Sequence, residues 1–316
     1  MAYITQDAPR DGEIYGRRNG AWVKIINPSY EIRRSGTRIA SLTPSDLKAR
    51  IADGTLLNDF QIGDQLIVKW TDPATGTEYE CPFNFGTLQN WTLEDGTVKY
   101  GLGLESEYLL PVASIMFDNK EPSNSDSNIT KYGNNRWKFS NIRQWLNASG
   151  ENWFAAQHAA DAEPDTYNAY TGFLDTLPVD FVNALTPVQV KTQAHSVDGG
   201  GVDTTVDKFF LLSTYEMNLA HRANANYTAA DGVEGAPWDI WKQKNSGSLW
   251  TSANNTTQNA MRVKKNIENK TANVSWLRSA YLGHSYGVWC VYSSGYFGAS
   301  AASAARRVAP ACVICG

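Results

Sequence analysis

The sequences Trp276-Leu-Arg-Ser279 and Arg307-Val-Ala-Pro-Ala-Cys-Val-Ile314 enclose a stretch of unusual composition. Between them, residues 281–305 run Tyr-Leu-Gly-His-Ser-Tyr-Gly-Val-Trp-Cys-Val-Tyr-Ser-Ser-Gly-Tyr-Phe-Gly-Ala-Ser-Ala-Ala-Ser-Ala-Ala, with no Lys, Glu, Gln, Met or Asp. Lys and Glu are common on ordinary protein surfaces, so their absence indicates a specialised surface. Tyr offers large, rigid contact area, while Ser and Gly adapt to a partner. We therefore predict a binding surface within residues 276–316, carried on a rigid scaffold.

The composition places the chain among globular proteins. Of 316 residues, 42% are hydrophobic and 19% are charged, which suits one large domain or two ordinary ones. No apolar run approaches the roughly 18 residues that span a bilayer, so membrane insertion is not expected. The first ten residues lack the basic and apolar segments of a secretory signal. The net charge of −4 provides no basic footprint, so we expect no nucleic-acid partner.

The first part of the chain carries hairpin signals. Asp11-Gly12 and Asn19-Gly20 flank a short strand, and the second turn joins it to a strand over 21–26. This element resembles a short piece found in many phage tail and fibre proteins. We assign residues 1–34 to a β-hairpin assembly or attachment element with a linker, the linker signal extending over 27–40. Residues 35–316 then form the ligand-binding domain.

Local patterns predict the elements of this larger domain. Thr43-Pro44 and Gly54 give a helix its start and stop signals. Alternating apolar runs and turns predict antiparallel strands over 60–117. The remaining expectations are a surface loop over 118–135, a capped helix over 140–147, short helices over 179–188 and 213–221, a buried strand over 207–213, and a functional loop or ordered insertion over 222–274 with Trp238, Trp241 and Trp250.

Four motifs in order resemble those of a C-type-lectin-like family related to formylglycine-generating enzymes. They are Trp137-Lys-Phe-Ser-Asn-Ile-Arg-Gln-Trp-Leu-Asn147, Asp207-Lys-Phe-Phe-Leu-Leu-Ser-Thr-Tyr-Glu216, Trp276-Leu-Arg-Ser279 and Arg307-Val-Ala-Pro-Ala-Cys-Val-Ile314. The subgroup that they resemble is the variable proteins of diversity-generating retroelements. This resemblance implies an α+β fold: a C-type-lectin-like domain with mixed antiparallel sheets and a few helices, preceded by the small N-terminal hairpin.

The resemblance also implies how residues 281–305 vary. In such retroelements, adenines of template Asn codons are randomised, which permits Tyr, Ser, Ala, Gly, His, Cys and Phe but never Lys, Glu, Gln, Met or Trp. The expected displayed variable positions are Tyr281, His284, Tyr286, Gly287, Cys290, Tyr292, Tyr296, Gly298, Ala299, Ser300, Ala302 and Ala305. The expected scaffold positions are Trp276, Arg278, Trp289, Arg307 and Pro310.

Catalysis and metal binding are weighed beside this interpretation. The related enzymes use a pair of cysteines, for which Cys290 and Cys312 are candidates, but neither lies in a matching motif. Cys312-x-x-Cys315 lacks a second metal-binding pair and is expected to be apolar strand packing. Carboxylates in residues 195–203 could bind calcium or magnesium, although their spacing does not match an EF-hand. We therefore expect no enzyme activity, no catalytic residue, no protein-metal centre and no cofactor, with a bound calcium or magnesium ion left open.

The resemblance implies a hypervariable receptor-binding protein of a phage tail. Its partners would be a host cell-surface protein or glycan and other tail proteins, and it would be made in the bacterial cytoplasm and carried on the virion. A homo-oligomer, a trimer by analogy, would raise avidity. The alternatives are a bacterial or prophage-encoded surface-displayed variable protein, and an enzyme of the formylglycine-generating type.

Overall fold

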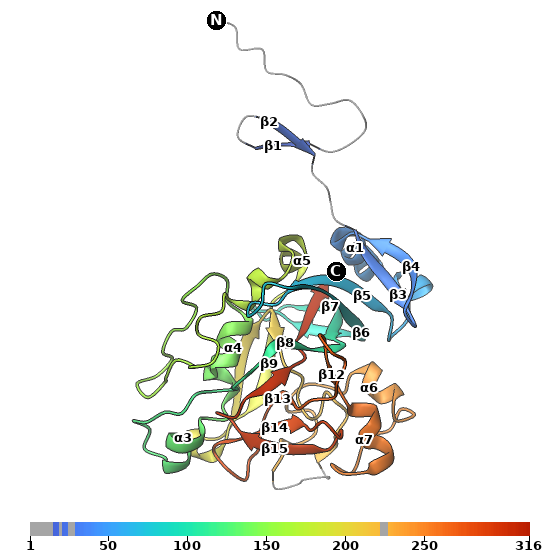
Figure 1. The fold of residues 1–316 in the computed structure, drawn as a ribbon. Coiled ribbons are helices and arrows are strands. Elements are labelled where there is room, and N and C mark those ends of the chain that lie inside the picture. The colour runs from blue at the N-terminus through green and yellow to red at the C-terminus, as the bar shows by residue number, and fades with distance from the viewer. Residues whose placement is uncertain (1–14, 19–20, 25–28, 222–226) are drawn as a thin grey trace, which may run out of the picture.

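The chain is an α+β protein in which two large β-sheets share a core and short helices cover them (Figure 1). The computed structural model describes residues 15–18, 21–24, 29–221 and 227–316. No helix among these residues is long and apolar enough to cross a membrane. The α+β class expected from the sequence is confirmed.

The first sheet has seven strands in the order β11-β17-β7-β6-β5-β3-β4. Their bounds are β3 Tyr30–Arg34, β4 Thr37–Leu42, β5 Gln65–Thr71, β6 Glu78–Thr92, β7 Val98–Ser106, β11 Phe209–Phe210 and β17 Ala311–Cys315. Strands β5, β6 and β7 follow one another antiparallel, as the alternating pattern over 60–117 predicted. Residues 27–40 were expected to be a linker, which is wrong from residue 30 onward: residues 30–42 form the hairpin β3–β4, and β3 pairs with β5. The chain thus enters the sheet before the boundary that we placed at residue 35.

The second sheet has six strands in the order β12-β8-β16-β13-β14-β15. Their bounds are β8 Tyr108–Ile115, β12 Lys265–Asn266, β13 Ser275–Ala280, β14 Gly287–Val291, β15 Phe297–Ala301 and β16 Arg306–Val308. A separate two-stranded sheet consists of β9 Val188–Gln193 and β10 Val202–Asp207.

Two chain segments pass from one large sheet to the other. Strand β7 runs into β8, and β16 runs into β17, so that β17 pairs with β7 while β16 pairs with β8. At the crossing, the backbone N–H of Ser106 donates to the carbonyl of Pro310 at 2.9 Å. The C-terminal anchor 307–314 therefore contributes an interior strand to each sheet, as expected for a scaffold element.

Short helices lie on the outside of the sheets. They are α1 Pro44–Ala52, α2 Leu56–Asp59, α3 Ser127–Tyr132, α4 Asn141–Leu146, α5 Val179–Ala184, α6 Asp239–Gln243 and α7 Thr256–Arg262, with 3-10 turns η1 Trp137–Phe139, η2 Phe173–Thr176 and η3 Ser196–Asp198. Thr43 caps α1 in a capping box with Asp46, and Ser140 caps α4, which confirms both predicted starts. The helix expected over 213–221 is wrong, because those residues form turns and an isolated bridge.

The expected surface loop 118–135 and the long polar segment 222–274 both contribute residues to the core. The loop 118–135 contains α3 and buries Asp118 and Glu121. In the long polar segment, Trp238, Trp241 and Trp250 are at most 1% exposed, so this part is an ordered insertion. Truncating one buried Trp to Ala typically costs about 3–5 kcal/mol, which explains how a glycine- and asparagine-rich segment stays folded.

The N-terminal hairpin forms as the sequence predicted. Strands β1 Tyr15–Arg18 and β2 Ala21–Lys24 pair antiparallel, with Arg18 opposite Ala21. The predicted turns at Asp11-Gly12 and Asn19-Gly20 lie outside the described residues. Among the described strands, β1 and β2 pair only with one another.

Candidate ligand-binding face

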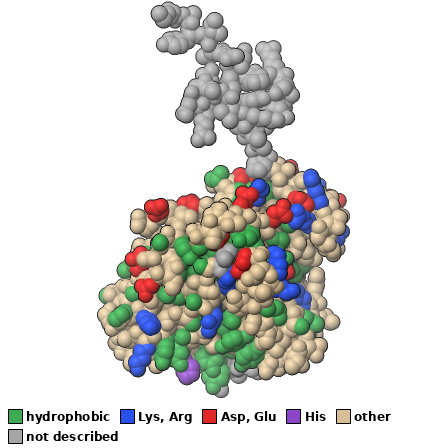
Figure 2. Space-filling view, in the orientation of Figure 1, with side chains coloured by type: hydrophobic (Ala, Val, Ile, Leu, Met, Phe, Trp, Pro, Cys, Tyr) green, Lys and Arg blue, Asp and Glu red, His purple; other side chains and the backbone are tan. Residues whose placement is uncertain are grey.

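A hollow of about 310 Å³ opens beside the hairpin β14–β15. This hairpin lies at the end of the body opposite α1, β3 and β4 (Figure 1). Residues from one continuous part of the chain line the hollow: Tyr281, His284, Tyr286, Gly287, Trp289, Tyr296, Gly298, Ala299, Ser300 and Ala301. Eight of the twelve expected variable positions are among them. Figure 2 shows side chains of the hydrophobic class, which includes Tyr, gathered at this end beside a histidine.

The other four expected positions lie elsewhere. Cys290 and Ala302 are fully buried, so the expectation that they are displayed is wrong. Cys290 lies in the middle of β14 and joins the hydrophobic core, while Ala302 follows β15 and accepts a hydrogen bond from the Phe117 N–H. Tyr292 stacks on Tyr296 with ring centroids 5.8 Å apart. Ala305 is exposed but does not line the hollow.

Five aromatic rings form a stacked row along one wall of the hollow, which we call the ring row. In order, the row is Tyr227, Tyr281, His284, Tyr286 and Tyr132. The successive centroid separations are 4.7, 5.6, 5.4 and 4.7 Å. The first three pairs are close to parallel and the last is tilted by 40°. Such stacking restricts the positions of the rings, and rings fixed in advance lose less entropy on any contact that they make.

Backbone contacts hold the turn between β13 and β14 in place. The buried amide of Asn135 donates to the carbonyls of His284 and Gly287, both at 2.9 Å. The carbonyl of Tyr227 accepts from the Leu282 N–H at 2.8 Å and from the Trp289 indole at 3.1 Å. The polar surface of the hollow therefore rests on a turn fixed from two separate segments of the chain.

Glycine sets the space at the floor of the hollow. A Cβ added at Gly298 would lie 2.5 Å from a ring carbon of Tyr292 and 2.8 Å from one of Tyr296. One at Gly287 would lie 3.1 Å from the Cβ of Tyr281. Because the atoms near Gly298 belong to the far ends of side chains, a larger residue there would displace the Tyr292–Tyr296 stack.

The expected scaffold residues are buried. The Trp276 indole donates to the carbonyl of Ile115 at 3.1 Å. Arg307 pairs with Glu268 at 2.9 Å and donates to the carbonyl of Pro111 at 2.6 Å. Trp289 is 2% exposed and forms part of the wall of the hollow.

Arg278 is the most enclosed charge of the scaffold. Its guanidinium is 1% exposed, forms a two-point ion pair with Glu216, and donates to the carbonyls of Leu211 and Glu234, each at 2.7 Å. Burial raises the pKa of Glu234, whose carboxyl group accepts from Ser279, and the charge of Arg278 opposes that rise. This network ties β13, which leads into the hollow, to the insertion around residue 234.

The cysteines considered for catalysis are enclosed. Burial raises the pKa of the Cys290 thiol to about 12 and that of Cys312 well above its ordinary value. A thiol acts as a nucleophile through its thiolate, which such burial disfavours. Cys315 lies in β17, where it packs in the core as the sequence predicted.

The carboxylates considered for calcium or magnesium have other contacts. Asp203 pairs with Arg136 at 2.7 Å, and Asp198 accepts from the Asn134 amide at 3.1 Å. Within the described part of the chain, no three His, Cys, Asp or Glu side chains converge as metal ligands.

Sequence reasoning missed three residues of this face. Tyr132 and Tyr227 extend the ring row at its two ends, and Asn135 fixes the turn. Tyr132 and Asn135 lie in a stretch expected to be a surface loop, and Tyr227 lies in the long polar segment. Their spacing to residues 281–287 exceeds 50 positions, so no local pattern connects them.

Fold and site together define an α+β protein with an aromatic-walled hollow at one end of a β-sheet. A domain of unknown function, DUF6273, matches residues 104–316. Because that match covers more than half of the chain, the protein belongs to this family. The matched part holds the whole six-stranded sheet and the hollow. Among curated proteins none matches the chain, and among solved structures none matches it either.

Proposed function

We propose that this protein is a hypervariable ligand-binding protein that adheres to a host surface molecule through the hollow. The observation that carries the proposal is that eight positions expected to vary, scattered over residues 281–300, surround one opening. These positions come from the turn after β13 and from the hairpin β14–β15, which present them around a common hollow. The Tyr, Ser, Gly and Ala lining matches the chemistry of natural paratopes.

The remaining parts of this proposal follow from the resemblance to the variable proteins of diversity-generating retroelements. The fold would be C-type-lectin-like, the protein would be a phage tail component carried on the virion, and the hairpin β1–β2 would attach it to other tail proteins. A hollow of this size limits the affinity of one copy, so a homo-oligomer would add avidity. The mixed lining, free of Lys and Arg, favours neither nucleic acid nor a lipid surface as the partner.

Binding rather than catalysis is also favoured by the enclosed thiols. An enzyme of the formylglycine-generating type would need a reactive cysteine pair, whereas Cys290 and Cys312 are buried and their pKa values are raised. We therefore propose a non-enzymatic role without a resident cofactor.

Comparing gene copies from many isolates tests the variability. We expect substitutions to concentrate at the eight lining positions and to spare Trp276, Arg278 and Arg307. Cys290 and Ala302 provide an internal control, because their residue types fit the pattern while their burial forbids free exchange. Substitutions spread evenly along the chain, or free exchange at these two buried positions, would show that the face is not a diversified surface.

Adsorption to intact bacterial cells tests the binding itself. Fluorescently labelled wild-type protein is first screened against a panel of strains, and one that retains it is chosen. Replacing Tyr286 and Tyr296 by Ala should reduce adsorption at least tenfold, because both rings border the hollow. The matched control is Tyr100→Ala, which removes an exposed tyrosine of β7 outside the face. Equal losses in both variants would contradict the proposal.

A further inference from the structure

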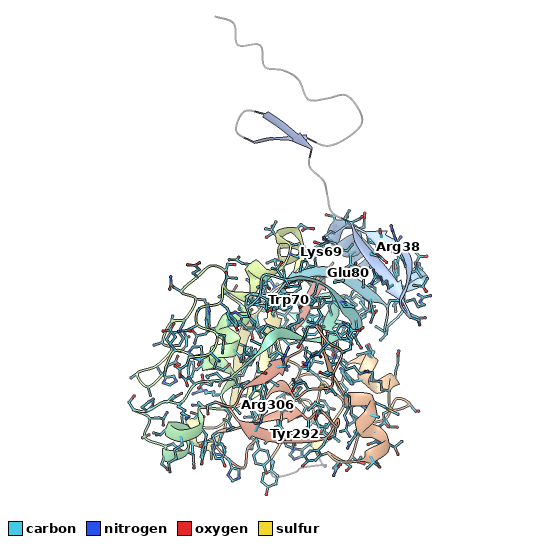
Figure 3. All side chains as sticks on the ribbon, viewed as in Figure 1. Arg38, Lys69, Trp70, Glu80, Tyr292 and Arg306 are labelled. Carbon is cyan, nitrogen blue, oxygen red and sulfur yellow. The ribbon has the colours of Figure 1, made fainter. Side chains whose placement is uncertain are left out.

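Arg306 stands out because its charge is not neutralised and because it contacts Ser300, a residue that lines the hollow. It begins β16, and its Nη2 donates to the Ser300 hydroxyl at 3.1 Å while its Nη1 donates to the Ala305 carbonyl at 2.8 Å. Among the described residues, no carboxylate lies within ion-pair distance of it. The next residue, Arg307, pairs with Glu268 at 2.9 Å, and Arg278 pairs with Glu216. Figure 3 places Arg306 beside Tyr292, at the end of the molecule that holds the hollow.

Two N–H groups of this guanidinium are still available. Arginine has five N–H donors, two of them on each terminal nitrogen. The contacts to Ser300 and Ala305 use one on each, and the Nε is buried without a partner. One N–H on Nη1 and one on Nη2 therefore remain. That pair matches the two oxygens of a carboxylate.

The lining of the hollow also suits a carboxylate. No Asp or Glu belongs to it. Burial raises the pKa of Tyr281, and the neighbouring Tyr227 and Tyr296 raise it further, so this phenol stays protonated and can donate a hydrogen bond. In the ring row, Tyr281 and His284 are each stacked on neighbours on both sides, while Tyr286 is stacked on His284 and tilted by 40° against Tyr132. The electron-rich faces are thus used internally, which leaves the electropositive ring edges to meet a ligand.

We propose that the hollow takes a carboxylate-bearing group and that Arg306 contacts its oxygens. This inference rests on the proposed binding function and adds the chemical class of the ligand. It also adds a contact residue outside the expected variable set. The carboxylate would lie at the Ser300 side of the hollow, with the uncharged body of the ligand against Tyr286 and Tyr296. An acidic sugar and an acidic amino-acid side chain both offer that chemistry.

Matched acid and neutral probes test the proposal on the full chain. Sodium D-glucuronate is compared with D-glucose, and N-acetyl-L-glutamate with N-acetyl-L-glutamine, by NMR titration of the backbone signals of residues 281–306. We expect each acid that binds to do so at least fivefold more tightly than its neutral partner, and the preferred pair to identify the source of the carboxylate. Raising the salt concentration should weaken binding of the acid only, because the Arg306 contact is partly exposed.

Two variants assign the effect to Arg306. Arg306→Gln should lower the affinity for the acid about tenfold, equivalent to one charge-assisted contact, and leave the neutral probe unchanged. The control is Arg38→Gln. Arg38 also donates to a serine hydroxyl, Ser41 at 2.8 Å, but lies at the opposite end of the molecule (Figure 3). Its loss should leave both affinities unchanged.

The outcomes separate this inference from the proposed function. Equal affinity for acid and neutral probes, or an acid affinity that survives Arg306→Gln, would overturn the carboxylate assignment while leaving the hollow as a binding site. The same holds if no probe shifts the signals of the hollow: the carboxylate assignment then fails, and the isolate comparison and the adsorption assay still decide the binding function.

Discussion

Replacing Arg278 by Met should be among the most destabilising single changes in the second sheet. The guanidinium is 1% exposed, and its removal leaves the Glu216 carboxylate buried without its counter-charge. Breaking a buried ion pair by removing one partner costs about 3–5 kcal/mol. The carbonyl of Leu211 loses a donor, worth about 1 kcal/mol, whereas that of Glu234 keeps the Ser213 hydroxyl at 3.1 Å. The expected loss is therefore about 4–6 kcal/mol.

That loss is measurable because it competes with the whole stability of a domain, which is about 5–15 kcal/mol. Urea unfolding followed by tryptophan fluorescence gives the free energy of unfolding of each variant. The decisive comparison is the double variant Arg278→Met with Glu216→Leu. It removes both charges and should recover most of the 3–5 kcal/mol, because no buried carboxylate is left unpaired.

The result that would refute this reasoning is specific. If Arg278→Met alone costs less than about 2 kcal/mol, the ion pair does not carry the scaffold role assigned to it. If the double variant loses as much as the sum of the two single changes, the two side chains act independently, and the network that ties β13 to the insertion is not cooperative.

Three further predictions follow from the structure. Burial, reinforced by nearby carboxylates, raises the folded-state pKa of Asp118 well above 3.8. The stability from its protonated form is therefore present below about pH 4 and is lost as the pH rises through the raised value. The urea midpoint should fall with rising pH less in Asp118→Asn than in wild type, and equal slopes would contradict this. Gly295→Ala should lower the free energy of unfolding by more than about 3 kcal/mol, since its Cβ would lie 1.8 Å from a backbone oxygen. Gly96→Ala, with the same φ of +83° and open space, should lower it by about 1 kcal/mol in the same unfolding assay, and similar losses would disprove the steric argument. Gly298→Ala should cost less than about 1 kcal/mol but displace two tyrosine rings, visible as ring-proton NMR shifts; unchanged shifts would count against the close packing.

Local chemistry in the sequence was enough for elements whose boundaries are fixed by short-range contacts. Thr43 and Ser140 start helices because their hydroxyls satisfy backbone N–H groups three residues along, and that geometry needs no distant partner. The alternation over residues 60–117 gave antiparallel strands for the same reason. By contrast, residues 213–221 have a helical pattern but form turns, because Ser213, Thr214 and Glu216 bond to the buried Arg278 network instead.

For the candidate face, the sequence by itself determined the chemistry of residues 281–305 and of the anchors Trp276 and Arg307 that flank them. Only the tertiary structure decided which of those residues meet: it buried Cys290 and Ala302 in the core and gathered eight others around one hollow. It also brought in Tyr132, Asn135 and Tyr227 from distant segments and left Arg306 without a carboxylate. The physical reason is that composition records the chemistry of each side chain, whereas exposure, stacking and charge pairing depend on which segments the two sheets bring together.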